Sequence, residues 1–410
     1  MMKIEKVIVA KGFGGFFWDD QAAIKTGIQR DGFIYLGRPV TPGFDSIRMP
    51  SECLSLLLIL DDGQIAHGDC VAVQYSGASG RDPVFKSDDY LPFFREHIVP
   101  MINGRDITTF RRMADDFDAL VFDNKPIHTA IRYGVTQAFL DAVAKSRKKT
   151  MAEVICEEYG LEMADTPIPV FIQTGDDLYE SVDKCILRRV DVFPHYLINN
   201  LKKLNELPEQ LEFTKKRITQ LADHTYAPYL HYDLYGMAGQ KYGRDLDKIM
   251  EDFRNWSRIV DPYSLIIEAP FIMDSREETV ELTGELIRRK SEEQLPIIIC
   301  VDEWCNTLED VRFMTDAGGA EMIQVKTPDM GGLNQSIAAI QYCQAKGLKA
   351  YLGGTCCETE RSAQISAHVA LATRPFQMLA KPGLGIDEGY QIVMNEMLRT
   401  LAIVKERGCP

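Results

Sequence analysis

From Pro169 onward, short apolar runs alternate with longer stretches in which apolar residues recur every three to four positions. The first run is VFIQT, the last is QMLAKPG, and each of the eight runs is followed by a helical stretch, over about 240 residues. Short apolar runs are typical of buried parallel strands, and the longer spacing indicates amphipathic helices. The pattern predicts an α/β fold with a (β/α)8 TIM-type barrel. A doubly wound sheet is the alternative, but it seldom has eight evenly spaced units.

The first 165 residues have a different pattern. KIEKVIVA, GFIYLG, CLSLLLIL and IAHGDCVAV are predicted strands, and Asp62-Gly63 between the last two predicts a hairpin turn. Helical periodicity then takes over and lasts to Tyr159. Strands followed by helices indicate an α+β unit, and the proline-containing segment MADTPIP marks its end. We therefore expect an α+β domain over residues 1–165 in front of a barrel domain over residues 166–410.

Composition narrows the class of protein. The chain is 45% hydrophobic and 26% charged, which is typical of a soluble globular protein. Its 46 basic and 60 acidic residues give a net charge of −14, which argues against nucleic-acid binding because the chain would repel phosphate backbones. The amino terminus has no signal-peptide pattern, and the longest apolar run, LSLLLIL, is too short to span a membrane. Scattered cysteines without CxxC spacing fit a reducing compartment. We expect a cytoplasmic protein that binds neither nucleic acid nor membranes.

Three acids follow consecutive predicted strands of the barrel. Asp233, Glu268 and Asp302 are separated by 35 and 34 residues, which is one strand–helix unit each. Because the carboxyl ends of barrel strands share one face, these side chains should converge there. Converging carboxylates repel unless a cation neutralises them, and an all-oxygen ligand set suits Mg²⁺. The alternative is that each acid caps a helix, a role common for Asp, which the shared register of all three disfavours.

Two further reactive side chains, those of Lys326 and His195, lie at the carboxyl ends of other predicted strands of the same barrel. Lys326 lies in the apolar segment IQVKTPD, and burial would lower its pKa, which makes it a plausible base. His195 ends the second strand, across the mouth from Lys326, where a catalytic role and a structural one are both open. His231 points to the same face as Asp233 but deeper, and we assign it a structural role.

Further polar residues at the strand ends are Gln173, Gln324, Thr355 and Cys356. The last two belong to the GGTCC turn (residues 353–357), whose backbone N–H groups could approach a carboxylate closely. Cys356 is more plausible as a substrate contact than as a nucleophile, because no base lies beside it in the sequence. No glycine-rich phosphate motif follows a strand, so nothing indicates a dinucleotide or ATP.

Acids on the third, fourth and fifth strands, a lysine on the sixth and an α+β domain in front resemble the enolase superfamily, in which such a domain caps the barrel. Within it, the sequence resembles the methylaspartate ammonia-lyase family nearly from end to end. The segments that carry this similarity are AVQYSGASGRDP, VFIQTGDD, PHYLINN, HYDLYG, IIEAP, VDEWCN, QVKTPDMGG, GGTCCET and AKPGLGIDEG. The resemblance implies a carbon–nitrogen lyase that eliminates ammonia from L-threo-3-methylaspartate to give mesaconate, in glutamate fermentation. It also implies Mg²⁺ as cofactor, activation by a monovalent cation such as K⁺, and a homodimer.

The same resemblance implies roles for individual residues. Asp233, Glu268 and Asp302 would hold Mg²⁺, which stabilises an enolate intermediate, and Lys326 would remove the C3 proton of the (2S,3S) substrate. His195 would be the base for the opposite C3 configuration. The substrate carboxylates would be bound on the metal side by His195 and Gln324, on the other side by Gln173, Thr355 and Cys356, and from the front domain by Gln74, as part of a lid.

One departure from the family concerns the GGTCC turn. Relatives of the clostridial type tend to have GGTCNET where this chain has GGTCCET, so Cys357 replaces an asparagine and could alter substrate preference at C3 or at the amine. The second strand has PHY rather than a KxK pair, which argues against racemase or cycloisomerase chemistry.

Two alternative functions remain open. A Schiff-base aldolase would use Lys326 but would not need three convergent acids. A barrel that has lost its catalytic activity and serves as a binding protein would be expected to lack one of the acids or the lysine.

Overall fold

A computed structural model of the chain describes residues 2–175 and 177–408 and contains a closed barrel of eight parallel strands. The strands pair in chain order and the last pairs with the first, so the predicted barrel is confirmed. The strands are β8 (Val170–Phe171), β9 (Val192–Leu197), β10 (Tyr229–Asp233), β11 (Leu265–Glu268), β12 (Ile297–Val301), β13 (Met322–Val325), β14 (Lys349–Leu352) and β15 (Gln377–Leu379).

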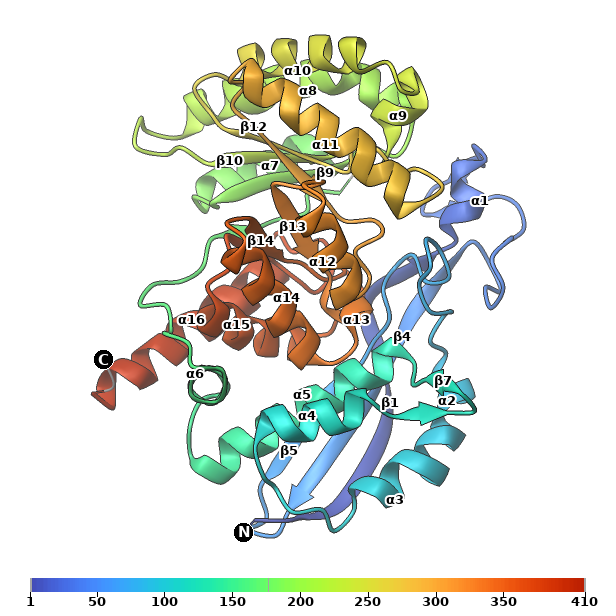
Figure 1. The fold of residues 1–410 in the computed structure, drawn as a ribbon, viewed down its shortest axis with the longest axis vertical. Helices are drawn as coiled ribbons and strands as arrows, with labels where there is room; N and C mark the ends of the chain where they lie inside the picture. The colour runs from blue at the N-terminus through green and yellow to red at the C-terminus, as the bar shows by residue number, and fades with distance from the viewer. Residues whose placement is uncertain (1, 176, 409–410) are drawn as a thin grey trace.

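Helices cover the outside of the barrel, with one main helix after each strand (Figure 1). They are α7 (Leu178–Leu187), α8 (Leu201–Leu221), α10 (Leu246–Val260), α11 (Arg276–Glu292), α12 (Leu308–Asp316), α14 (Leu333–Ala345), α15 (Glu360–Thr373) and α16 (Glu388–Glu406). Short helices α9 (Met237–Tyr242) and α13 (Thr327–Met330) precede α10 and α14. Most main helices begin at a residue whose side chain accepts a hydrogen bond from the first turn, which explains where they start. These caps are Asp177, Asn200, Asp245, Ser275, Thr307 and Thr359.

The barrel interior is packed with side chains and is not an open pore. Inward-facing residues from seven strands form one fully buried layer beneath the carboxyl ends, as is typical of such barrels. They are Phe171, Val192, Ile266, Cys300, Met322, Tyr351 and Leu379. This layer forms the floor above which polar residues at the strand ends can gather.

The amino-terminal part is an α+β capping domain built on a three-stranded antiparallel sheet in the order β1-β4-β5. Its strands are β1 (Ile4–Asp19), β4 (Arg48–Leu60) and β5 (Ile65–Cys70), and the predicted hairpin at Asp62-Gly63 joins the last two. Two small hairpins are β2 (Arg30–Asp31) with β3 (Ile34–Tyr35), and β6 (Val121–Phe122) with β7 (Lys125–Pro126). The helices are α1 (Gln21–Lys25), α2 (Ser87–Phe93), a π-helical turn η1 (Phe94–Ile98), α3 (Val99–Ile102), α4 (Phe110–Asp118), α5 (Thr129–Arg147) and α6 (Met151–Tyr159).

Helix α5 packs closely on the sheet of the capping domain, and glycine makes this approach possible. A Cβ added at Gly68 would lie 2.3 Å from the carbonyl oxygen of Gly134, and a Cβ at Gly134 would lie 2.5 Å from the backbone nitrogen of Cys70. The prediction that the strand IAHGDCVAV continues to Val73 was wrong, because β5 ends at Cys70. The chain leaves the sheet after Cys70 and turns towards the barrel, where the backbone N–H of Gln74 donates to Thr355 Oγ1 at 3.1 Å.

The capping domain sits against the carboxyl-terminal part of the barrel, and β1 and β4 extend up beside it (Figure 1). Buried polar contacts join the two parts. The Thr359 hydroxyl donates to Asp69 Oδ2 at 2.6 Å, and Arg81 Nε donates to Asp329 Oδ2 at 2.7 Å. Within the described ranges, no helix combines the length and apolar character needed to cross a membrane.

Candidate active site

A cavity of about 260 Å³ lies at the carboxyl ends of the barrel strands, beneath the capping domain. Aromatic and charged side chains of the capping domain, among them Phe16, Arg48 and Tyr75, form part of its wall. The predicted site residues that line it are Gln74, Gln173, His195, Asp233, Asp302, Gln324, Lys326, Thr355 and Cys356. Glu268 lies below the cavity wall, fully buried, and accepts a hydrogen bond from Gln324 Nε2 at 2.5 Å. The structure thus brings together the side chains that the sequence placed at separate strand ends.

Asp233 and Glu268 are neighbouring buried acids of the site. They end neighbouring strands and are direct partners in the β10–β11 register. Burial raises the pKa of both carboxyl groups well above the usual range, and the charges of nearby acids, including that of Asp302, act in the same direction. The helices that follow are capped by Asp245, Ser275 and Thr307, so helix capping does not explain Asp233, Glu268 and Asp302.

Asp302 is engaged by a lysine rather than grouped with the other two acids. Lys326 Nζ donates to Asp302 Oδ2 at 2.7 Å, from the residue that directly follows β13. Burial alone would lower the pKa of Lys326, but the charges of Asp302, Glu303 and Asp329 together outweigh it and the pKa is raised. The expectation that burial gives this lysine a lowered pKa is therefore wrong for this structure, because sequence spacing did not show that the two groups touch.

His195 lies beside the acids, with Nε2 3.7 Å from Asp233 Oδ2. Burial, together with the nearby charge of Lys326, lowers the pKa of His195 to about 4. The imidazole is therefore neutral near pH 7 and can accept a proton or bind a metal. Potential ligand atoms of His195, Asp233 and Glu268 all lie within 4.8 Å of one another, which makes this set a candidate metal centre.

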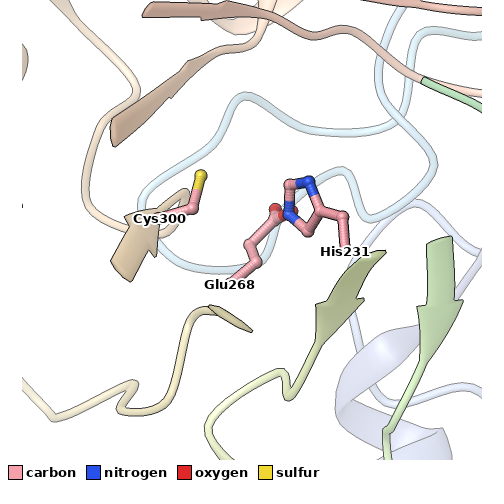
Figure 2. Close-up of side chains that lie close together, drawn as sticks. All are labelled: His231, Glu268 and Cys300. Atoms are coloured by element: carbon pink, nitrogen blue, oxygen red, sulfur yellow. The ribbon is translucent and has the colours of Figure 1, made fainter. Parts of the chain in front are cut away.

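A second set of potential ligands lies one layer deeper and consists of His231, Glu268 and Cys300. Figure 2 shows the His231 ring against the Glu268 carboxylate, where Nε2 lies 2.9 Å from Oε2. The ring is stacked on Phe171, with centroids 4.2 Å apart. Burial raises the pKa of the Cys300 thiol well above its usual range, and a thiol that keeps its proton is a poor ligand. We therefore interpret His231 as a support for Glu268, which refines the structural role assigned from the sequence.

The sequence analysis missed several charged residues of the site, among them Glu303 and Arg81. Glu303 directly follows Asp302, is buried, and has no hydrogen-bond partner on either carboxylate oxygen. Burial and the charge of Asp302 raise its pKa to about 7. Arg81 comes from the capping domain, and its Nη2 lies 3.9 Å from both Asp302 and Glu303. The adjacent acids in VDEW were a visible signal for Glu303, whereas no pattern in GASGRDP marks Arg81.

The GGTCC turn meets the capping domain through Gln74. Its side-chain oxygen accepts a hydrogen bond from Cys356 Sγ at 3.3 Å, and its Nε2 donates to Asp19 Oδ2 at 2.9 Å. Two of the backbone N–H groups that were predicted to approach a substrate carboxylate already donate hydrogen bonds within the protein. The N–H of Thr355 donates to Glu358 Oε2 at 2.8 Å, and that of Cys357 donates to Thr355 Oγ1 at 3.3 Å. Side chains, more than these amides, face the cavity.

Cys357 faces away from the cavity. Its Sγ donates to the backbone oxygen of Phe17 at 3.3 Å, and its own carbonyl accepts from the N–H of Gly15 at 3.0 Å. The residue therefore joins the GGTCC turn to β1. Any influence of Cys357 on substrate preference must act through the position of this strand, which carries the cavity residue Phe16.

The sequence matches two family models that together span nearly the whole chain. Residues 2–160 match the amino-terminal part of methylaspartate ammonia-lyase and residues 162–406 match its carboxyl-terminal part. A curated relative, methylaspartate ammonia-lyase 2 of Carboxydothermus hydrogenoformans, is 48% identical, with 99% of this chain and 100% of the relative covered.

Solved structures give the same result. The Mg-complex of β-methylaspartase from Clostridium tetanomorphum is 46% identical, with a TM-score of 0.94 over 99% of this chain and 100% of that one. The Citrobacter amalonaticus methylaspartate ammonia-lyase containing (2S,3S)-3-methylaspartic acid is 44% identical, with a TM-score of 0.96 over 98% of this chain and 100% of that one.

Proposed function

Since this chain belongs to the methylaspartate ammonia-lyase family and is a carbon–nitrogen lyase, we propose that it converts L-threo-3-methylaspartate into mesaconate and ammonia by an Mg²⁺-dependent proton abstraction. The observation that carries the proposal is the pairing of Lys326 with Asp302 beside the buried acids Asp233 and Glu268. A proton acceptor and a cation-binding centre then face the same cavity. Family membership also supports K⁺ activation, a cytoplasmic homodimer and a role in glutamate fermentation as parts of this proposal.

The acids fit a divalent cation by their chemistry. Carboxylates buried this deeply are unfavourable without a counter-charge, which is why the pKa values of Asp233 and Glu268 are raised. Oxygen ligands without a thiolate suit Mg²⁺. Asp233, Glu268 and Asp302 would hold it, and its charge would offset the second negative charge that develops on the substrate carboxylate when C3 loses its proton.

Lys326 would accept the C3 proton at Nζ. The charge of Asp302 raises the pKa of this lysine, so any neutralisation of that carboxylate lowers the pKa and frees the amine to act as a base. His195 stands on β9, four strands away around the barrel of eight, and so faces the cavity from the opposite side. A neutral imidazole there would take the C3 proton of the (2S,3R) isomer.

The remaining polar residues would orient the substrate. Gln324 and His195 lie next to Glu268 and Asp233 and would bind the carboxylate on the metal side. Gln173, Thr355, Cys356 and Gln74 line the cavity and would bind the other carboxylate. Because Gln74 comes from the capping domain, substrate binding would require the closed arrangement of the two domains. The acids beside Lys326 disfavour the Schiff-base alternative, since an aldolase of that kind would have no need for them.

The proposed function is tested with the purified protein and (2S,3S)-3-methylaspartate. We expect ultraviolet absorbance to rise as the conjugated diacid forms, to stop after treatment with EDTA, and to return on addition of Mg²⁺. Calorimetric titration of the metal-free protein with Mg²⁺ should show binding in the absence of substrate. Full activity after complete removal of divalent cations, or no conversion with Mg²⁺ present, would contradict the proposal.

Replacement of Cys356 with alanine is expected to raise KM and to leave kcat measurable. Among the described groups, the thiol has hydrogen-bonding contacts with Gln74, Thr355 and the neighbouring Cys357, and none of these is a base that could form a thiolate. Steady-state kinetics of Cys356→Ala would be compared with those of Cys357→Ala, whose side chain faces Phe17 and whose KM should stay near that of the wild type. A dead Cys356→Ala enzyme together with a covalent adduct in quenched wild type would instead establish a nucleophile.

A further inference from the structure

A fully buried ion pair lies behind the cavity wall and contacts no solvent. Lys381 follows β15 and Glu358 lies between β14 and α15; their side chains are 1% and 0% exposed. Lys381 Nζ lies 2.8 Å from both carboxylate oxygens of Glu358. Neither residue lines the cavity, so neither can touch the substrate.

The pair contacts the segments that carry the proposed catalytic groups. Lys381 Nζ donates to Thr327 Oγ1 at 3.2 Å, in the residue directly after Lys326, and to the carbonyl oxygen of Gly353 at 3.1 Å, in the GGTCC turn. Glu358 accepts from the backbone N–H of Thr355 at 2.8 Å. Two strand-end segments are therefore attached to one ion pair.

The capping domain contributes the third attachment. The Tyr133 hydroxyl on α5 donates to Glu358 Oε1 at 2.5 Å, and Tyr133 is fully buried. Space around the pair is filled, because a Cβ added at Gly354 would lie 2.1 Å from Glu358 Oε2 and 2.5 Å from Lys381 Nζ. The backbone of Gly354, with φ at +147°, also requires glycine.

Stability alone is a weak reason for such a pair. Two buried charges lose their hydration, and apolar side chains of similar volume often serve a fold equally well or better. A fully satisfied buried network does fix the geometry of its members. Building on the proposed function, we propose that Lys381 and Glu358 are positioning residues that hold Lys326, Thr355 and the capping domain in the register that proton abstraction requires.

The test uses the full chain and a double variant in which both charges are removed, Lys381→Met with Glu358→Gln. The double variant leaves no unpaired buried charge, so it remains informative where either single variant fails to fold. We expect its thermal midpoint and Mg²⁺ affinity to stay near those of the wild type. Its kcat should fall, on the order of 10²-fold, with a smaller change in KM, because a small misplacement of a reacting group costs about this much.

A matched control is available at the opposite end of the barrel. Lys290 pairs with Glu321 at 2.7 Å and donates to the carbonyl oxygen of Ile297, where β12 begins. The corresponding double variant, Lys290→Met with Glu321→Gln, changes a lysine–glutamate pair, with the lysine buried and the glutamate partly buried, that is remote from the strand ends that form the cavity. We expect its kcat to match that of the wild type.

Amide hydrogen exchange gives a readout that does not depend on turnover. Exchange should become faster at residues 326–330 and 353–357 in the first double variant and stay unchanged there in the control. If the wild type does not convert 3-methylaspartate, the proposed function fails while the exchange comparison still decides the role of the pair. Wild-type kcat and unchanged exchange in the Lys381/Glu358 variant would overturn the inference and leave the proposed function intact.

Discussion

Replacement of Lys326 with alanine is expected to lower the rate of ammonia elimination from (2S,3S)-3-methylaspartate by on the order of 10²–10⁴-fold or more. Lys326 Nζ is the amine that faces the cavity next to the acid cluster, 2.7 Å from Asp302 Oδ2. Without it, no positioned group remains on that side to accept the C3 proton. Mg²⁺ binding should persist, because the lysine is not among the expected ligands.

The rate is measured by product absorbance, and C3 proton exchange with deuterated solvent is followed by NMR. Loss of exchange would place the defect at proton abstraction and not at release of ammonia. His195→Ala is the matched variant on the opposite side of the barrel, and it should reduce turnover of the (2S,3R) isomer at least as strongly. Near wild-type turnover by Lys326→Ala would show that another group is the base.

The second large effect is expected from the acids. Asp233→Asn and Asp302→Asn should each weaken Mg²⁺ binding by about 10–100-fold or more, since even residues that only support metal ligands have effects of this size. The two variants should differ in one respect. Asp233 does not contact the lysine, whereas loss of the Asp302 charge also removes the interaction that raises the pKa of Lys326. At saturating Mg²⁺, the remaining activity of Asp302→Asn should therefore rise at a lower pH than that of Asp233→Asn, because the lysine acts as a base only after it has lost its proton.

Calorimetry measures the Mg²⁺ affinity, and circular dichroism checks that the fold is retained. Asp191→Asn provides the control, because Asp191 is a carboxylate directly before β9 that accepts a hydrogen bond from the backbone N–H of Val170 at 3.1 Å and does not line the cavity. Its replacement should leave the Mg²⁺ affinity unchanged. Unaltered affinity in both Asp233→Asn and Asp302→Asn would remove these acids from the metal site.

The barrel was predictable from the sequence because each of its strands is buried on both faces. Such strands appear as short apolar runs, and amphipathic helices between them keep their own period. The same regularity placed Asp233, Glu268 and Asp302 one unit apart and therefore at one end of the barrel. The capping-domain hairpin at Asp62-Gly63 was predictable for a similarly local reason, since turn geometry depends on neighbouring residues.

Contacts between distant segments could not be predicted in this way. Arg81 reaches Asp302 and Asp329 only because the capping domain docks on the barrel, and the sequence around it carries no period that indicates this. Lys381 and Glu358 belong to different strand-end segments of the barrel, and Glu358 also contacts Tyr133 of α5 in the capping domain. In the sequence, Lys381 and Glu358 look like ordinary solvent-exposed charged residues, and only the fold shows that both are buried.

The sequence by itself determined which residues stand at the carboxyl ends of the strands, because hydrophobic periodicity sets strand position and register. Only the tertiary structure decided which of these groups touch. Lys326 shows the difference: its place was predictable, but the direction of its pKa shift was not. Burial and neighbouring charges act in opposite directions on a lysine, and the acids that the fold gathers around Lys326, with Asp302 at 2.7 Å and Glu303 and Asp329 nearby, together determine which of them prevails.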